Sequence, residues 1–196
     1  MKQPSSWSTG ASRLRKLGCA AMVFCCLLNT SLLVAQKVGR DKPWQELVST
    51  EGRFRVLLPD TPEDRFVRVP GQIVNTEMRA YFVSSAVASY VVAYADFPKK
   101  DPRSLKQAFD DSRALALAGG RVRMISEKDL TTVNMPGCEF VIDDGVNVIK
   151  DRLYYSNGRL YQVMFIAPES NGMSDEFVKF YDGLASKFFD SFKIGS

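Results

Sequence analysis

The acidic side chains that could do chemistry gather around one predicted hairpin. Asp143, Asp144 and Asp151 lie close together in the sequence, and Glu139 comes just before them. Carboxylates grouped in this way could bind a hard cation such as calcium, which takes several oxygen ligands. They could also act as an acid and base pair. The spacing is not that of a calcium-binding loop, and Asp-Asp-Gly also suits a tight turn. We therefore predict a turn here and keep Asp143, Asp144 and Asp151 as weak candidate metal ligands.

A second charged group precedes a predicted helix. Lys99, Lys100 and Arg103 surround its expected start, and helix N-termini attract anions such as phosphate. However, Asp101 is predicted to cap the helix, and Pro102 removes one N–H donor. The pattern thus favours a solvated charged loop over an anion site.

Three tyrosines and one cysteine have simpler interpretations. Tyr154, Tyr155 and Tyr161 surround an Asn-Gly turn, and a two-residue turn would place Tyr154 opposite Tyr161. Aromatic pairs across strands stabilise sheets, although an exposed patch for a partner is the alternative. Cys138 is predicted to be a buried small apolar residue and not a nucleophile, as is usual for a free cysteine.

The composition excludes several kinds of active site. The sequence contains no histidine, so it lacks the base of Ser-His-Asp and Cys-His catalysis and the usual ligands of zinc. It contains no phosphate-binding loop of the Walker type, and no G-x-G-x-x-G follows a strand. We therefore predict a protein without catalytic residues or a cofactor.

The N-terminus has the pattern of an export signal. Basic residues at positions 2, 13, 15 and 16 precede an apolar run at residues 17–28, a polar break at 29–31 and a second short apolar run ending at Ala35. This order is typical of a secretory signal peptide cut after Ala35. The alternative is an uncut membrane anchor at residues 17–35, which is just long enough to span a bilayer. The prediction is an exported protein, periplasmic or extracellular, with a polar leader at 36–43 and one domain at 44–196.

Cleavage would change the charge and the cysteine content. The whole chain carries 26 basic and 22 acidic residues, and the predicted signal holds four of the basic ones. The mature protein would be formally neutral, which argues against nucleic acid as a partner because phosphates attract clustered Lys and Arg. Three of the four cysteines also lie in the signal, so Cys138 alone cannot form an internal disulfide.

The mature chain is predicted to consist mostly of strands. Its apolar runs are rich in Val, Tyr and Phe and are bounded by Pro-Gly, Asp-Gly and Asn-Gly pairs. Short turns imply antiparallel neighbours. The expected strands are residues 53–58, 65–69, 73–84, 88–95, 122–125, 130–133, 139–142, 146–155 and 159–166.

Two helices are expected between and after these strands. The first begins at Asp101 and ends at Gly119-Gly120. The second begins near Ser174, and its aromatic residues recur at helical spacing, which predicts that they pack on the sheet. That stripe consists of Phe177, Phe180, Tyr181, Leu184 and Phe188. The fold class is therefore α+β, an antiparallel sheet of about six to eight strands with helices laid on it.

Several strings resemble the PsbP-like domains of secreted bacterial proteins. They are EGRFRVLLP (51–59) with Trp44 ahead of it, YVVAYADFP (90–98), PGCEF (136–140), RLYYSNGRLYQVMF (152–165) and KFFDSFKI (187–194). The superfamily includes the extrinsic PsbP protein of photosystem II and a Ran-binding nuclear transport factor, both of them accessory binding proteins. The resemblance implies an αβα sandwich with a binding or accessory role, and it supplies no active-site motif.

The expected function is an exported, non-catalytic accessory domain that binds an unknown protein or another envelope component. Contact with the membrane itself is expected only if the N-terminal segment stays uncut. The alternative is a carboxylate-dependent hydrolase or a cation-binding protein that uses the acidic hairpin around Asp143.

Overall fold

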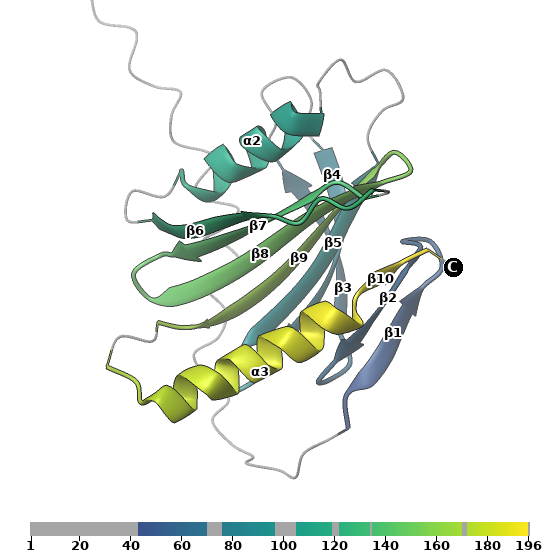
Figure 1. Ribbon diagram of the computed structural model, residues 1–196. Helices are drawn as coiled ribbons and strands as arrows, with labels where there is room; N and C mark the ends of the chain where they lie inside the picture. Colours follow the sequence, from purple (N-terminus) through teal and green to yellow (C-terminus); the bar gives the residue numbers. More distant parts are fainter. Residues whose placement is uncertain are drawn as a thin grey trace, which may run out of the picture.

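The computed structural model describes residues 43–69, 76–96, 105–118, 122–133, 135–169 and 172–195. The predicted signal peptide and nearly all of the leader lie outside these residues, as do Lys99, Lys100, Asp101, Pro102 and Arg103. The described part of the chain contains ten strands and two helices, which are arranged as in Figure 1. The strands are β1 (Gln45–Ser49), β2 (Phe54–Leu58), β3 (Glu63–Val69), β4 (Thr76–Ser84), β5 (Ser89–Asp96), β6 (Arg123–Asp129), β7 (Gly137–Asp143), β8 (Asn147–Ser156), β9 (Arg159–Pro168) and β10 (Lys193–Ile194), and the helices are α2 (Leu105–Ala116) and α3 (Asp175–Ser191).

Seven strands form one antiparallel sheet in the order β3-β4-β5-β9-β8-β7-β6. The β8–β9 hairpin turns at Asn157 and Gly158, which both have positive φ, at 50° and 77°. These angles suit a two-residue turn of the primed type. Tyr154 therefore pairs with Tyr161, as the Asn-Gly pair predicts.

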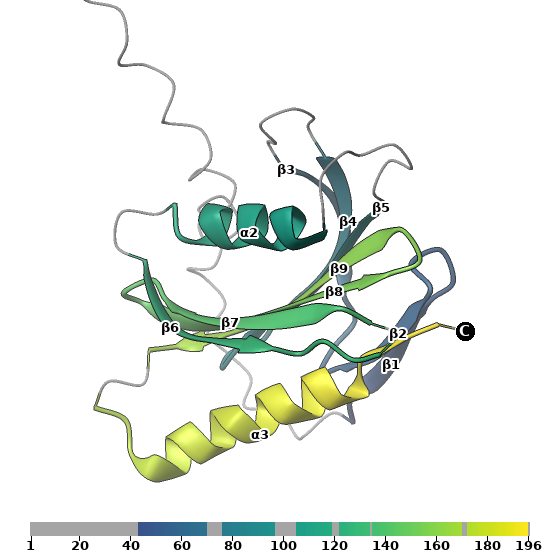
Figure 2. The same ribbon diagram turned by 45° about the horizontal axis from the view of Figure 1, so that its top comes forward.

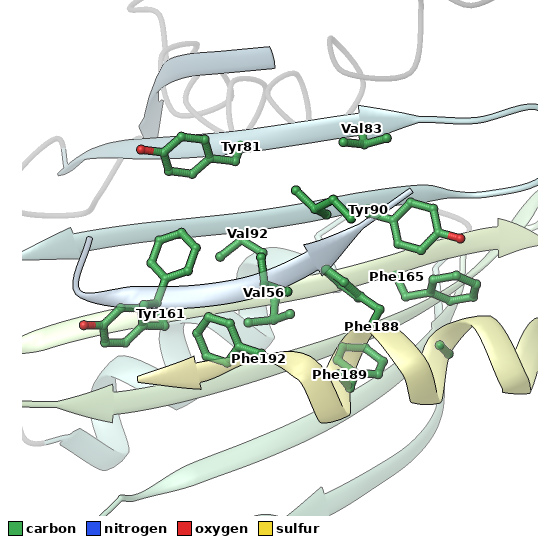
Figure 3. Close-up of a cluster of buried hydrophobic side chains, with 14 of the residues drawn as sticks. Val56, Tyr81, Val83, Tyr90, Val92, Tyr161, Phe165, Phe188, Phe189 and Phe192 are labelled. Atoms are coloured by element: carbon green, nitrogen blue, oxygen red, sulfur yellow. The ribbon is translucent and has the colours of Figure 1, made fainter. Parts of the chain in front are cut away.

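A smaller sheet and α3 close one face of the large sheet. The small sheet has the order β1-β2-β10, and α3 lies beside it on the same side (Figures 1 and 2). Aromatic side chains fill the space between these layers, with Phe188 of α3 against Tyr90 of β5 at 5.3 Å between ring centroids. Figure 3 shows this cluster, which includes Tyr161 and Phe192. The ring of Phe54 also contacts the rings of Tyr161 and Phe192.

The opposite face carries α2, which lies over the β6–β8 side of the sheet (Figure 2). A second apolar cluster forms there from Phe140, Ile142, Ile149 and Leu153, with Phe109 and Ala116 of α2 packed against it. The three layers confirm the predicted α+β architecture, a helix on each side of an antiparallel sheet, and the seven strands fall within the predicted number.

Three strand assignments from the sequence were wrong or incomplete. The segments 122–125 and 130–133 are not two strands, because one strand, β6, spans Arg123–Asp129, and Thr132 then forms an isolated bridge with Met135. This edge strand is largely exposed and carries charges on both faces, so it has no apolar alternation to detect. Strands β1 and β10 were not predicted, since one is mostly polar and the other has two residues.

The turn from β1 to β2 is held by buried residues from distant parts of the chain. The hydroxyl of Tyr161 donates to the Gly52 carbonyl at 3.0 Å, and the Gly52 N–H donates to the Ser49 hydroxyl at 3.0 Å. Arg159 is only 6 % exposed, and its guanidinium donates a hydrogen bond to the Glu51 carbonyl. It also forms a bidentate ion pair with the Asp96 carboxylate, at 2.6 and 2.8 Å. The string EGRF thus has a structural role in joining the two sheets.

Candidate functional site

The acidic hairpin is built by ordinary turn chemistry. Asp143 accepts hydrogen bonds from the Gly145 N–H and from Arg123, each at 2.8 Å. Asp144 accepts from the backbone N–H groups of Val146 and Asn147 at 2.9 and 2.6 Å. The Arg123 contact and the Gly145 N–H hold the pKa of Asp143 below its usual value. Both carboxylates therefore use their oxygens to fix the β7–β8 turn.

The other two carboxylates lie on opposite faces of the sheet. Glu139 accepts a hydrogen bond from Arg152 at 2.6 Å, and the Arg152 guanidinium sits over the Phe189 ring of α3. Asp151 immediately precedes Arg152 on β8. Because successive side chains of a strand point to opposite faces, the Asp151 side chain points toward α2. Within the described ranges, no group of three or more Cys, Asp or Glu side chains could hold a metal ion. The structure thus does not bring Asp143, Asp144 and Asp151 together.

Asp151 is nevertheless the most unusual acid among the described residues. Its side chain is buried between Ile149 and Leu153, next to Phe140 on β7 and Met164 on β9. One oxygen, Oδ2, accepts a hydrogen bond from Gln162 at 2.7 Å, and the other, Oδ1, has no partner. Burial raises the pKa of Asp151 to about 7, against a smaller opposite effect of the Gln162 donor. A buried carboxyl group with a single donor favours its neutral form.

Two hollows lie on the same face as Asp151. The larger, about 390 Å³, is bounded by α2, β6 and β7 and includes Phe109, Cys138 and Phe140 in its wall. The smaller, about 240 Å³, lies at the β4–β5 turn and includes Ile149, Met164 and Val87. Phe140 and Met164 are the residues directly opposite Asp151 on its two neighbouring strands. The buried acid therefore sits between the two hollows.

The free thiol in the wall of the larger hollow favours its protonated form. Cys138 is partly buried against the α2-side cluster, slightly more exposed than predicted. Burial, with smaller effects from Asp151, Glu127 and Asp129, raises the pKa of Cys138 to about 12. The thiolate is the nucleophilic form of cysteine, and a raised pKa leaves little of it at neutral pH.

Only the C-terminal half of the aromatic stripe on α3 is buried, whereas the whole stripe was predicted to pack on the sheet. Its C-terminal half packs as expected, with Phe188 and Phe189 buried and Phe192 following them. Phe177 and Phe180, in contrast, are 59 % and 47 % exposed, and Val178 beside them is 36 % exposed. The prediction that Phe177 and Phe180 pack on the sheet was therefore wrong. All residues from Asp175 to Phe180 are exposed, because the first turns of α3 extend away from the sheet (Figure 2).

We call Phe177, Val178 and Phe180 the α3 patch. Asp175 and Glu176 precede it, Lys179 lies within it, and Asp182 beyond it is paired with Lys150 of β8 at 2.6 Å. The patch is thus apolar with more negative than positive charge around it. The tyrosines form no comparable surface, since Tyr154 and Tyr161 are buried and contact Phe192.

The burial of Asp151 was not predicted, although the sequence pattern of β8 indicates it. Ile149, Asp151 and Leu153 alternate along β8 and therefore share one face. That pattern places the acid in an apolar row. No pattern in the sequence indicates which part of α3 the sheet covers. The exposure of the α3 patch could therefore not be predicted from the sequence.

Comparison with known proteins shows the fold. No family model matches this sequence, and no curated protein matches it. The solution structure of cyanobacterial PsbP (CyanoP) from Synechocystis sp. PCC 6803 is similar, with a TM-score of 0.51 and 15 % sequence identity. The match covers 83 % of this chain and 98 % of that one.

Proposed function

With a PsbP-like fold as the framework, we propose that this protein is an exported, non-catalytic accessory domain that binds a partner protein of the cell envelope through the α3 patch. The observation that carries this proposal is the exposure of Phe177, Val178 and Phe180 side by side on one helix end. Apolar side chains exposed singly are common on protein surfaces, whereas large contiguous apolar patches mark interaction sites. Aromatic residues contribute most strongly to such interfaces.

The charges around the patch indicate the kind of partner. Asp175 and Glu176 stand at one end, and the nearby Asp182 is already paired with Lys150. Acidic groups here would repel an anionic lipid surface and attract basic side chains. We therefore propose a protein partner with an apolar surface bordered by Lys or Arg.

Export is the second part of the proposal and rests on the N-terminal sequence. A basic start, an apolar run and the small residue Ala35 form the order of a secretory signal. In the described part of the structure, neither helix is long and apolar enough to cross a bilayer. We propose that the signal is removed after Ala35 and that the domain acts in the periplasm or outside the cell.

A photo-crosslinking amino acid placed at position 177 tests the binding surface. We expect a discrete adduct with one envelope protein when the variant is irradiated in its native cells. Position 66 is the matched control, because Phe66 on β3 is also an exposed phenylalanine, at 66 % against 59 %. Asp175→Lys with Glu176→Lys should weaken the adduct at position 177 by charge repulsion. Equal adducts at positions 66 and 177, or an adduct that survives charge reversal unchanged, would contradict the proposal.

A further inference from the structure

The carboxyl group of Asp151 lies in an environment that does not suit an ionised carboxylate. In the closed structure it is 3 % exposed, within the apolar cluster that α2 covers. One oxygen receives a hydrogen bond from Gln162 and the other has no partner. An ionised carboxylate held there would lack most of the donors that water supplies, which is costly. The group must therefore bind a proton or reach water.

Helix α2 is attached to the sheet through fewer buried residues than α3. Strand β8 is hydrogen-bonded on both sides, to β7 and to β9, so it cannot leave the sheet without breaking two ladders. In α2, Ala108 is the one described residue that is buried, whereas α3 buries Ala185, Phe188 and Phe189. The ion pair from Arg113 to Glu127 ties α2 to β6 at 2.9 Å, but both side chains are more than 40 % exposed. Such pairs hold elements together weakly.

The other charged groups on this face have partners of their own. Asp110 pairs with Lys106 at 2.6 Å, Asp111 accepts from Gln107 at 2.9 Å, and Asp129 accepts from the Thr131 N–H at 2.7 Å. Cys138 of β7 stays a neutral thiol because burial raises its pKa to about 12. On α2, β6 and β8, the remaining titratable groups of this face are Arg113, Glu127 and Tyr155, whereas Lys128 lies opposite Glu139 on the other face. None of these supplies a counter-charge within hydrogen-bond distance of Asp151 in the described structure.

We propose that Asp151 is a proton-controlled switch for the docking of α2. When its carboxyl group is neutral, α2 packs over the cluster and closes this face of the sheet. When the group loses its proton, α2 separates from the sheet and opens the apolar surface formed by Phe140, Ile142, Ile149 and Leu153.

The direction of the pH effect follows from linkage. The pKa of Asp151 is about 7 in the closed structure, above its ordinary value of 3.8. A raised pKa means that the closed form binds the proton more tightly than the open form does. The stabilisation of the closed form is therefore complete at low pH and is lost as pH rises through about 7. Between pH 5.5 and pH 8.5 we expect the opening constant of α2 to rise about 30-fold.

Hydrogen exchange of the α2 amides measures that constant. In the purified protein, protection of α2 should fall about 30-fold from pH 5.5 to pH 8.5 after correction for intrinsic exchange. Protection of the α3 amides should not follow the same curve. Asp151→Asn, neutral at all pH values, should abolish the pH dependence in α2. Asp182→Asn is the matched control, since it removes an exposed carboxylate on α3 and should leave the dependence intact.

Three outcomes would overturn the switch. These are an unchanged pH dependence in Asp151→Asn, a parallel loss of protection in α3, and constant protection of α2 in the wild type. If Asp151→Asn does not fold, the carbon-13 signal of the Asp151 carboxyl group can be titrated in the wild-type protein. A midpoint near 7 accompanied by chemical-shift changes in α2 supports the proposal, and a midpoint below about 5 contradicts it.

Discussion

Replacing Phe188 by alanine is expected to destabilise the domain by about 3–5 kcal/mol, the usual cost of removing a buried phenylalanine. Phe188 is fully buried, and its ring meets Tyr90 of β5 and Phe189 of its own helix. The side chain therefore joins α3 to the centre of the large sheet (Figure 3). Domains of this size commonly have about 5–15 kcal/mol of stability in total, so the loss should be plain in a chemical denaturation curve.

Phe177→Ala is the matched control for this experiment. It removes the same atoms from the same helix, but at a position that is 59 % exposed. Surface substitutions usually change stability by no more than about 0.5 kcal/mol. If both variants lose equal stability, the first turns of α3 are packed and the α3 patch does not exist as a free surface.

The second large effect is expected at Gly52, in the turn between β1 and β2. A Cβ atom added there would lie 2.5 Å from the Phe54 ring and 2.7 Å from the Ser49 hydroxyl. Phe54 is buried and is enclosed by Tyr81, Tyr94, Tyr161 and Phe192. Because that ring has no room to shift, Gly52→Ala should cost about 1–3 kcal/mol through overpacking. Thermal unfolding followed by circular dichroism measures the change.

Gly183→Ala serves as its control, since a Cβ atom at Gly183 meets nothing within 4 Å. Gly183 lies within α3, where alanine is favoured over glycine by about 1 kcal/mol. We therefore expect this variant to be slightly more stable than the wild type. A Gly52→Ala protein with an unchanged melting temperature would show that the β1–β2 turn does not constrain the core.

The sequence contains enough information for both helices and for six of the seven strands of the large sheet. Alternation along residues 146–155 and the Asn157-Gly158 pair predict β8, β9 and their register, because strand periodicity and turn geometry are local properties. Strands β1, β6 and β10 do not follow from local pattern. They form through pairing with β2 or β7, and their side chains are mostly exposed.

The candidate site was less predictable, because it depends on which surfaces remain uncovered. The acidic hairpin is a turn, as Asp-Asp-Gly predicts, and its carboxylates are occupied by backbone N–H groups and by Arg123. Helical spacing alone places Phe177 and Phe188 on one stripe. Tertiary structure separates them, since the sheet covers the end of α3 that holds Phe188 and leaves Phe177 exposed.

The most direct test of the binding proposal is the accessibility of position 177 in intact cells. Phe177→Cys and Phe66→Cys would be labelled, in cells and after purification, with a small maleimide that passes the outer membrane but does not cross the cytoplasmic membrane. Cys138 should add little background, because its thiol pKa is about 12. We predict that both new cysteines react in the purified proteins, that Cys at 66 also reacts in cells, and that Cys at 177 is protected at least about tenfold there by the bound partner. Equal labelling at the two positions in cells would contradict a bound partner at the α3 patch, and no labelling at position 66 would contradict export.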